Sequence, residues 1–170
     1  DMLSNNLANA NTGGYKLDRE FYSLFRQSEG AEADSVEGQA TTLPMIQKRW
    51  TDFKQGELQP TGKPLDLSIN GKGFFSANTP SGPLYTRNGS FKLSRDGVLS
   101  TAEGYPVRGV GGGHIQVSSQ APIDISADGS VQQSGETLGQ IEVSGFADPN
   151  TLTKVGGSYF KQPNPALKPL

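Results

Sequence analysis

The sequence contains no cysteine, a single histidine and no long hydrophobic run. Without cysteine the chain can form neither a disulfide nor a thiolate metal site, and it has no cysteine nucleophile. No stretch approaches the roughly 20 apolar residues that a membrane-spanning helix needs. The first residues also lack a basic end followed by an apolar run. We therefore expect neither a membrane helix nor a signal peptide.

Positive and negative charges are also nearly balanced in this sequence. Fifteen Lys and Arg residues stand against 17 Asp and Glu residues, which gives a net charge of -2. The basic residues are scattered and form no stripe that could neutralise phosphates, so nucleic acid is not an expected partner. The 22 Gly and 11 Pro residues favour many short strands joined by turns. We expect one compact domain with less ordered flanks.

Two glycine-rich segments resemble nucleotide-binding loops but fail their requirements. Five residues separate Gly56 from Gly62, whereas a phosphate loop needs four, and Pro64 stands where the motif has a hydroxyl. The segment 109–114 lacks the last glycine of a dinucleotide-binding fingerprint, and no helical pattern follows it. A flexible loop is the favoured interpretation of the segment 109–114.

No group of residues suggests catalysis or metal binding. His114 has no orienting partner at local spacing, and Asp124 and Asp128 match neither a calcium loop nor a pair of glycosidase carboxylates. Asn88-Gly89-Ser90 matches a glycosylation sequon, but a hairpin turn explains it more simply. We expect no catalytic residue, no metal ligand and no cofactor.

Residues 1–12 are predicted to form a short helix. Leu3, Leu7 and Ala10 have helical spacing, and Gly13-Gly14 provides a stop. A helix this short is marginal in water and needs a partner. Four of the residues 5–11 are asparagines with alanines between them. Two interpretations stay open: a solvated helix, or an assembly face where another helix approaches closely and exchanges side-chain hydrogen bonds.

The composition divides the chain into four parts. Residues 1–26 form an N-terminal segment, in which the aromatic stretch after Tyr15 fits a helix and an extended chain equally well. Residues 27–64 form a linker, rich in Ser, Gly, Ala and Glu at its start, and an extended segment around Trp50. A β-rich domain is predicted over 65–161, and a proline-rich tail over 162–170.

Residues 65–161 alternate between apolar and polar side chains, which is typical of half-buried strands. The alternating apolar residues are Leu65, Leu67, Ile69, Phe91, Leu93, Ile115, Val117, Ile123, Ile125, Ile141 and Val143. Dipeptides that tolerate tight turns separate them: Asn70-Gly71, Asn88-Gly89, Asp96-Gly97, Asp128-Gly129 and Ser134-Gly135. The predicted fold class is mainly β, a compact antiparallel domain built as a meander or a small barrel.

The chain resembles the flagellar basal-body rod protein family, which is related to the hook protein, in several ordered blocks. The first block is Leu3-Ser4-Asn5-Asn6-Leu7-Ala8-Asn9-Ala10-Asn11-Thr12-Gly13-Gly14-Tyr15-Lys16. Others are Gln55-Gly56-Glu57-Leu58-Gln59-Pro60-Thr61-Gly62-Lys63-Pro64-Leu65-Asp66-Leu67, Gly71-Lys72-Gly73-Phe74-Phe75 and Tyr85-Thr86-Arg87-Asn88-Gly89-Ser90-Phe91. Asp96-Gly97, Gly104-Tyr105-Pro106-Val107 and Val155-Gly156-Gly157 continue the likeness in order, so it extends over nearly the whole chain.

This resemblance implies terminal helices that pair in an inner tube and a β-rich domain farther out. The C-terminal helix of the family is absent from this sequence, whose last residues contain three prolines, and a fragment is expected. The resemblance also implies a structural subunit, not an enzyme, exported by the flagellar type III apparatus without a cleaved signal peptide. Its location would be the periplasmic rod of the basal body.

We therefore expect a rod subunit that polymerises helically into the axial drive shaft, contacts other rod and hook subunits and transmits torque for motility. The residues expected at the assembly interface are Leu3, Asn5, Asn6, Leu7, Asn9, Asn11, Thr12 and Tyr15. The alternative is a cell-envelope β module that binds a glycan or peptide through exposed aromatics such as Tyr85 and Tyr105. That alternative needs no asparagine-rich helix. Proximal and distal rod proteins are not distinguished by the sequence.

Overall fold

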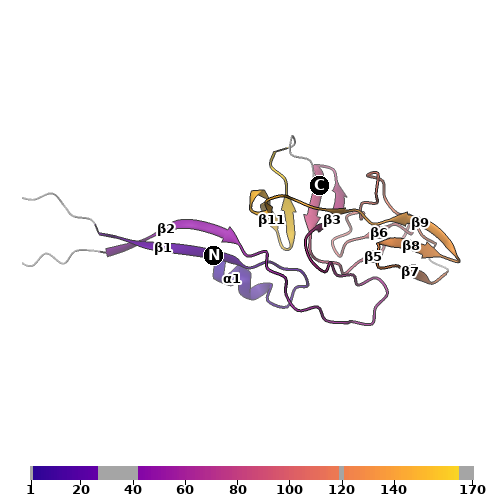
Figure 1. Ribbon diagram of the computed structural model, residues 1–170, viewed down its shortest axis with the longest axis horizontal. Coiled ribbons are helices and arrows are strands. Elements are labelled where there is room, and N and C mark those ends of the chain that lie inside the picture. Colours follow the sequence, from indigo (N-terminus) through magenta and orange to yellow (C-terminus); the bar gives the residue numbers. More distant parts are fainter. Residues whose placement is uncertain (1, 27–41, 119–120, 165–170) are drawn as a thin grey trace, which may run out of the picture.

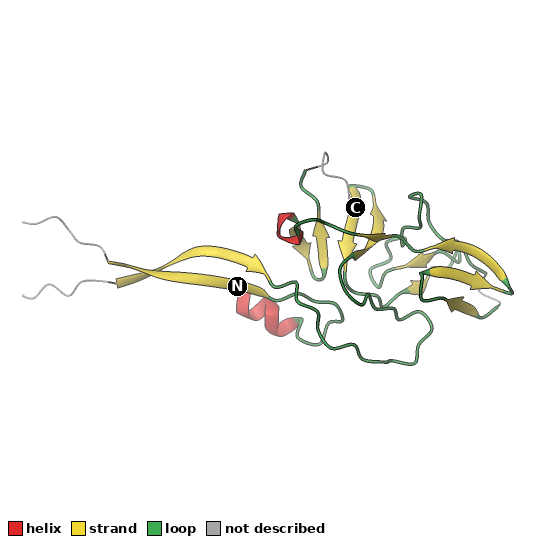
Figure 2. Cartoon of the chain, in the orientation of Figure 1, coloured by secondary structure: helices red, strands yellow, loops and turns green. Residues whose placement is uncertain are grey.

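The structure is a computed structural model that describes residues 2–26, 42–118 and 121–164. Over these residues the chain is mainly β, with antiparallel sheets and one short α-helix at the N-terminus (Figure 2). This confirms the predicted fold class. Of its two variants, the small barrel is wrong, because the strands of the described residues form separate open sheets and no closed barrel.

The N-terminal part forms an arm that extends away from the rest of the chain (Figure 1). Helix α1 spans Met2–Ala8, after which turns lead to Gly14, so the helix is shorter than the predicted 1–12. Strands β1 (Asp18–Arg26) and β2 (Thr42–Thr51) pair as a long antiparallel hairpin. The segment after Tyr15 is therefore extended. The acidic stretch predicted as a linker start lies at 27–41, outside the described residues.

A five-stranded antiparallel sheet is the centre of the β domain. Its strand order is β10-β3-β4-β12-β11. The strands span Phe74–Thr79 (β3), Gly82–Thr86 (β4), Val143–Ser144 (β10), Thr153–Gly156 (β11) and Tyr159–Lys161 (β12). A short 3₁₀ helix, η1 (Pro149–Thr151), precedes β11, and Asp148 caps it by accepting a hydrogen bond from the Asn150 N–H.

Two smaller sheets complete the domain. One pairs β5 (Lys92–Leu93) with β6 (Leu99–Ser100), and the other has the order β7-β8-β9. Strands β7, β8 and β9 span Ile123–Ile125, Ser130–Gln133 and Glu136–Gln140. Their turns are as predicted, because Gly97, Gly129 and Gly135 all have positive φ angles, of 75°, 84° and 84°.

Several predicted strands and turns differ from the structure. The segments 65–69 and 115–117 are irregular and make only isolated bridges, such as Asp66 with Ser90 and Val98 with Gln116. Asn70-Gly71 and Asn88-Gly89 are not hairpin turns. The chain around Gly89 pairs with 65–67, while β4 pairs with β3 and β12, so the strand partners come from distant parts of the sequence.

Adjacent phenylalanines at the start of β3 divide the core into two clusters. Successive side chains of a strand point to opposite faces of its sheet, so Phe74 and Phe75 enter different clusters. Phe75 packs in the larger cluster with four of the alternating residues identified in the sequence, Phe91, Ile115, Val117 and Ile141, and with three that were not, Leu99, Val107 and Val131. Phe74 packs on the other face with Tyr85, Leu152 and Phe160.

Phe53 belongs to this second cluster, although it lies before the predicted domain boundary at residue 65. Its ring centroid is 5.7 Å from that of Phe74 and 5.2 Å from that of Phe160. Residues 52–161 should therefore melt cooperatively as an isolated fragment, and 65–161 should be less stable by about 1–3 kcal/mol. Circular dichroism melts of both fragments measure this. Phe53→Ala in the longer fragment should reproduce the loss, and equal melts of all three would contradict it.

Candidate assembly surface

Leu3 and Leu7 form an exposed apolar stripe on α1. They are four residues apart, so their side chains lie on one face of the helix. Leu3 is 72% and Leu7 79% exposed, and α1 buries none of its residues. Burying a leucine side chain contributes roughly 1.5–3 kcal/mol. The stripe is therefore a surface that another apolar element would stabilise by covering it.

The asparagines next to this stripe hold α1 against the hairpin. The Asn6 Nδ2 donates to the Asp18 carbonyl (2.9 Å), and the Asn6 Oδ1 accepts from the Asp18 N–H (3.2 Å). The Tyr15 hydroxyl lies 2.7 Å from the Asn5 Oδ1 and 3.0 Å from the Asn6 Oδ1. A helix of seven residues has little stability of its own. These bonds fix its position at the base of β1.

The remaining predicted interface residues lie in the turns after α1. The Asn9 Nδ2 donates to the Asn5 carbonyl (2.9 Å), and the Thr12 hydroxyl donates to the Asn9 Oδ1 (3.3 Å). Asn11 is exposed at the edge of a groove. Leu3, Leu7 and Asn11 thus face outward, whereas the others make hydrogen bonds inside the chain. Contact of any of these eight residues with another subunit stays a prediction.

Lys154 of β11 ties the base of the hairpin to the edge of the central sheet. Its Nζ donates to the Asp18 carboxylate (2.9 Å) and to the Lys16 carbonyl (3.0 Å), and lies 4.0 Å from the centroid of the Tyr15 ring. The other Asp18 carboxylate oxygen accepts from the Thr51 hydroxyl (2.8 Å). Lys154 therefore links Tyr15, which holds α1, and Asp18 of β1 to the central sheet. We call Tyr15, Lys16, Asp18, Thr51 and Lys154 the joint.

Lys16 reinforces the joint from a buried position. Its Nζ donates to the Lys54 carbonyl at 2.7 Å. Burial lowers the pKa of Lys16, and the nearby Arg87 lowers it further, while Asp52 opposes the shift. The preceding Gly14, at φ 69°, lies so near the Arg87 carbonyl that an added Cβ would be 2.2 Å from the carbonyl carbon. Only glycine allows this approach of the N-terminal turn to the β domain.

Lys154→Met should loosen the arm without unfolding the β domain. Methionine has a similar length but cannot make the two hydrogen bonds of the Lys154 Nζ, one of which is the ion pair with Asp18. Local opening of the joint should therefore become easier by about 1–3 kcal/mol. Amide exchange of Asp52, whose N–H donates to the Leu17 carbonyl at 2.8 Å, reports that opening. Lys161→Met, at an exposed position of β12, is the matched control. Equal exchange at Asp52 in both variants would refute the role of Lys154.

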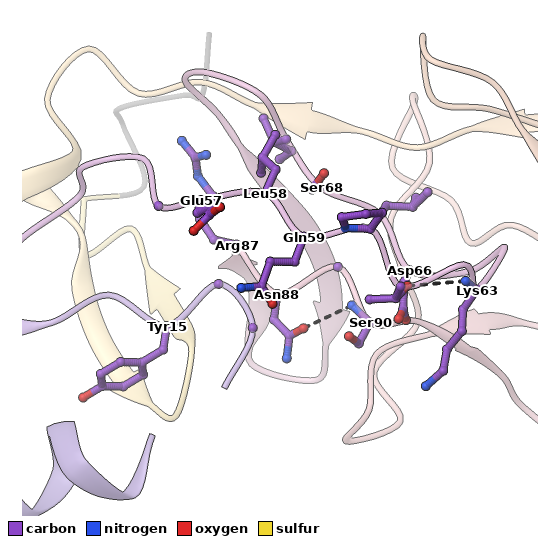
Figure 3. Close-up of a pocket in the computed structure, with 18 of the residues that line it drawn as sticks. Tyr15, Glu57, Leu58, Gln59, Lys63, Asp66, Ser68, Arg87, Asn88 and Ser90 are labelled. Carbon is purple, nitrogen blue, oxygen red and sulfur yellow. Dashed lines mark hydrogen bonds between the residues drawn. The ribbon is translucent and has the colours of Figure 1, made fainter. Parts of the chain in front are cut away.

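A groove of about 770 Å³ lies beside the joint. Its walls come from the turn 13–16, the irregular segment 55–63, the segment 66–69 and the loop 87–90 (Figure 3). Figure 3 shows the Tyr15 side chain directed toward α1, where its hydroxyl meets Asn5 and Asn6. Within the described residues, no three His, Asp or Glu side chains gather as a metal site would require.

The two aromatics named in the alternative hypothesis both pack against other rings of the chain. Tyr85 is buried, and its ring packs edge-on against Phe146 with centroids 4.8 Å apart. Tyr105 packs edge-on against Tyr159 at 5.8 Å. The expectation that Tyr85 is an exposed aromatic is therefore wrong, because the apolar ring of a strand residue facing the second core cluster is more stable when buried.

Sequence reasoning identified the leucine stripe and missed the joint. Leu3 and Leu7 carry a local signal, their spacing. Lys154 and Asp18 are 136 residues apart, and neither stands out by its neighbours in the sequence. No local pattern in a single sequence connects two such residues, because a contact of this kind shows only as covariation among homologues.

Comparison with known proteins agrees with this architecture. The family described as "Flagellar hook protein FlgE/F/G D1 domain" matches residues 68–133, which include most of the larger core cluster. The family described as "Flagella basal body rod protein" matches residues 1–16, which contain α1 and its anchor Tyr15. The two matches thus correspond to the first part of the β domain, up to β8, and to the N-terminal helix.

Curated relatives align with nearly the whole chain. The flagellar basal-body rod protein FlgF of Caulobacter vibrioides is 32% identical over 95% of this chain and 65% of its own length. FlgG of Bacillus subtilis is 34% identical over 95% of this chain and 67% of its own length, and FlgG of Buchnera aphidicola (from Acyrthosiphon pisum) is 32% identical over 100% and 70%. The chain spans about two thirds of the length of these relatives. It belongs to the flagellar basal-body rod protein family.

Proposed function

We propose that this chain is part of a structural subunit of the bacterial flagellar rod. In this proposal it polymerises helically with copies of itself and with other rod and hook subunits, after export through the flagellar apparatus. The observation that carries the proposal is the exposed stripe of Leu3 and Leu7 on a helix that Asn6 and Tyr15 hold in place. The family supports it, since its named members are basal-body rod proteins.

The fixed orientation of α1 favours association. A helix that orders only on binding would lose conformational entropy at that step, whereas α1 is already held at the base of β1. Its leucines face outward before any partner arrives. In a subunit of a non-closing helical polymer, each copy presents one such face and receives another, which extends the polymer.

The joint gives this subunit a mechanical role. Torque carried by a rod must pass from the assembly helix to the β domain of the same subunit. Lys154, Asp18 and Lys16 provide the contacts through which α1 and the hairpin are attached to the central sheet. A charge-assisted network of this kind resists local opening better than a single neutral hydrogen bond.

Deleting the gene in its host and restoring it tests the proposal. Deletion should abolish swimming and leave basal bodies without a complete rod, and the full-length protein should restore both. Electron microscopy of purified basal bodies and a motility assay give the readouts. Complete rods in the deletion strain would reject the proposed function.

A further inference from the structure

Asparagine followed by glycine can undergo a spontaneous reaction, and the chain contains two such pairs, Asn70-Gly71 and Asn88-Gly89. In this reaction the backbone nitrogen of the glycine attacks the side-chain carbonyl carbon of the asparagine. The missing Cβ of glycine allows that close approach. The reaction needs freedom of the asparagine side chain and of the peptide that follows it. The two pairs differ in this freedom in the structure.

Asn70 and Gly71 are both exposed, in a bend that leads into β3. The Asn70 side chain makes no hydrogen bond to any described residue. Gly71 has a φ of 105°, and an added Cβ would have no atom within 4 Å. The side chain of Asn70 can therefore rotate, and there is space around Gly71 for a ring to form.

Asn88 and Gly89 are held by hydrogen bonds and by close packing of the backbone. The Asn88 Oδ1 accepts from the Ser90 N–H (3.1 Å), as the dashed line in Figure 3 marks, and the Asn88 N–H donates to the Thr86 hydroxyl (3.0 Å). Gly89 is buried, and its carbonyl accepts from the Leu67 N–H at 2.9 Å. A Cβ on Gly89 would lie 1.8 Å from the Leu67 carbonyl oxygen, so this peptide has no room to rearrange.

We propose that Asn70 is a site of spontaneous deamidation in the folded protein and that the fold protects Asn88. The Gly71 nitrogen, losing its proton to solvent, bonds to the Asn70 Cγ. The Cγ–Nδ2 bond breaks, and ammonia leaves with a proton from solvent. Water then opens the five-membered imide at either carbonyl and gives aspartate or isoaspartate. Overall, one water is consumed and one ammonia released, with no oxidant or cofactor.

The product changes a defined place in the fold. A carboxylate at residue 70 adds one negative charge to the formal net charge of -2. The isoaspartate form also inserts a methylene into the main chain between Ile69, which packs against the larger core cluster, and Gly73. Gly73 is buried, with the Val143 side chain 2.6 Å from the position of an added Cβ. A lengthened main chain therefore enters β3 through a segment with little room.

Incubating the purified chain in mildly alkaline buffer tests the proposal. Peptide mapping by mass spectrometry should find the mass change of amide to acid at Asn70, with isoaspartate detected by enzymatic methylation. In the folded chain the reaction at Asn70 should be at least about tenfold faster than at Asn88, because conversion of Asn88 requires local opening. In denaturant the two rates should become similar, since the dipeptides are the same.

Two variants test whether the surroundings of each asparagine, and not its dipeptide sequence, set the rate of deamidation. Asn70→Gln should remove the reaction of the folded chain, because its longer side chain forms the corresponding ring far more slowly. Ser90→Pro, which removes the N–H bonded to the Asn88 Oδ1, should speed the reaction at Asn88 alone. An Asn70 that stays unmodified while the denatured chain converts would overturn the proposal. So would equal rates at Asn70 and Asn88 in the folded chain.

Discussion

Replacing Gly97 with Val is expected to destabilise the β domain by about 2–5 kcal/mol, through backbone strain and overpacking together. Gly97 has a φ of 75°, a conformation that a β-branched residue strongly disfavours. A Cβ at this position would also lie 2.2 Å from the Val117 carbonyl oxygen. That carbonyl belongs to the segment whose Val117 N–H donates to the Gly97 carbonyl at 2.8 Å. It cannot move away without breaking this contact.

Gly104→Val separates the two causes. Gly104 has a comparable φ of 94°, but no atom lies within 4 Å of the added Cβ. In this variant only backbone strain should act, and it should lower the free energy of unfolding by about 1–3 kcal/mol. Thermal or urea unfolding of both variants measures the difference. If Gly97→Val were no worse than Gly104→Val, the close approach of the β5–β6 turn to Val117 would not limit stability.

Leu7→Asp in the full-length protein should stop rod completion and abolish swimming while the β domain stays folded. A carboxylate in an apolar seam between helices costs several kcal/mol when it is desolvated without a partner. In the free subunit Leu7 is 79% exposed, so the substitution changes little inside the chain. Association should therefore suffer and folding should not. Motility assays and circular dichroism of the purified variant give the two readouts.

Ala10→Asp is the matched control for this charge. Ala10 is exposed in the turn after α1 and lies outside the leucine stripe. Leu7→Met, which keeps an apolar side chain, should preserve swimming. Normal flagella in the Leu7→Asp strain would show that the stripe is not an assembly face.

The local patterns of the sequence predicted the core better than the sheets. The alternating residues from Phe91 to Ile141 do pack into one cluster. Ile115 and Val117, however, reach that cluster from an irregular segment with single bridges. Apolar alternation reports which side chains are buried, and the hydrogen-bond partners of the backbone depend on contacts between distant segments.

In the N-terminal arm, too, local sequence patterns did not predict which backbone segments pair. The glycine pair after Thr12 predicts a helix that ends near residue 12. In the structure the helix ends at Ala8, because the Asn6 side chain bonds the Asp18 backbone and the Asn9 side chain bonds the Asn5 carbonyl. Such side-chain bonds compete with helical ones. The hairpin pairs Asp18 with Thr51 across an intervening acidic stretch that carries no hairpin turn signal. Its two strands were therefore not recognised as partners.

Cryo-electron microscopy of basal bodies from cells that make this protein tests the central claim most directly. The claim predicts rod density that accommodates the β domain, with α1 attached at the joint and Leu3 and Leu7 covered by another subunit. Rod density without this chain, or with both leucines facing solvent, would contradict it.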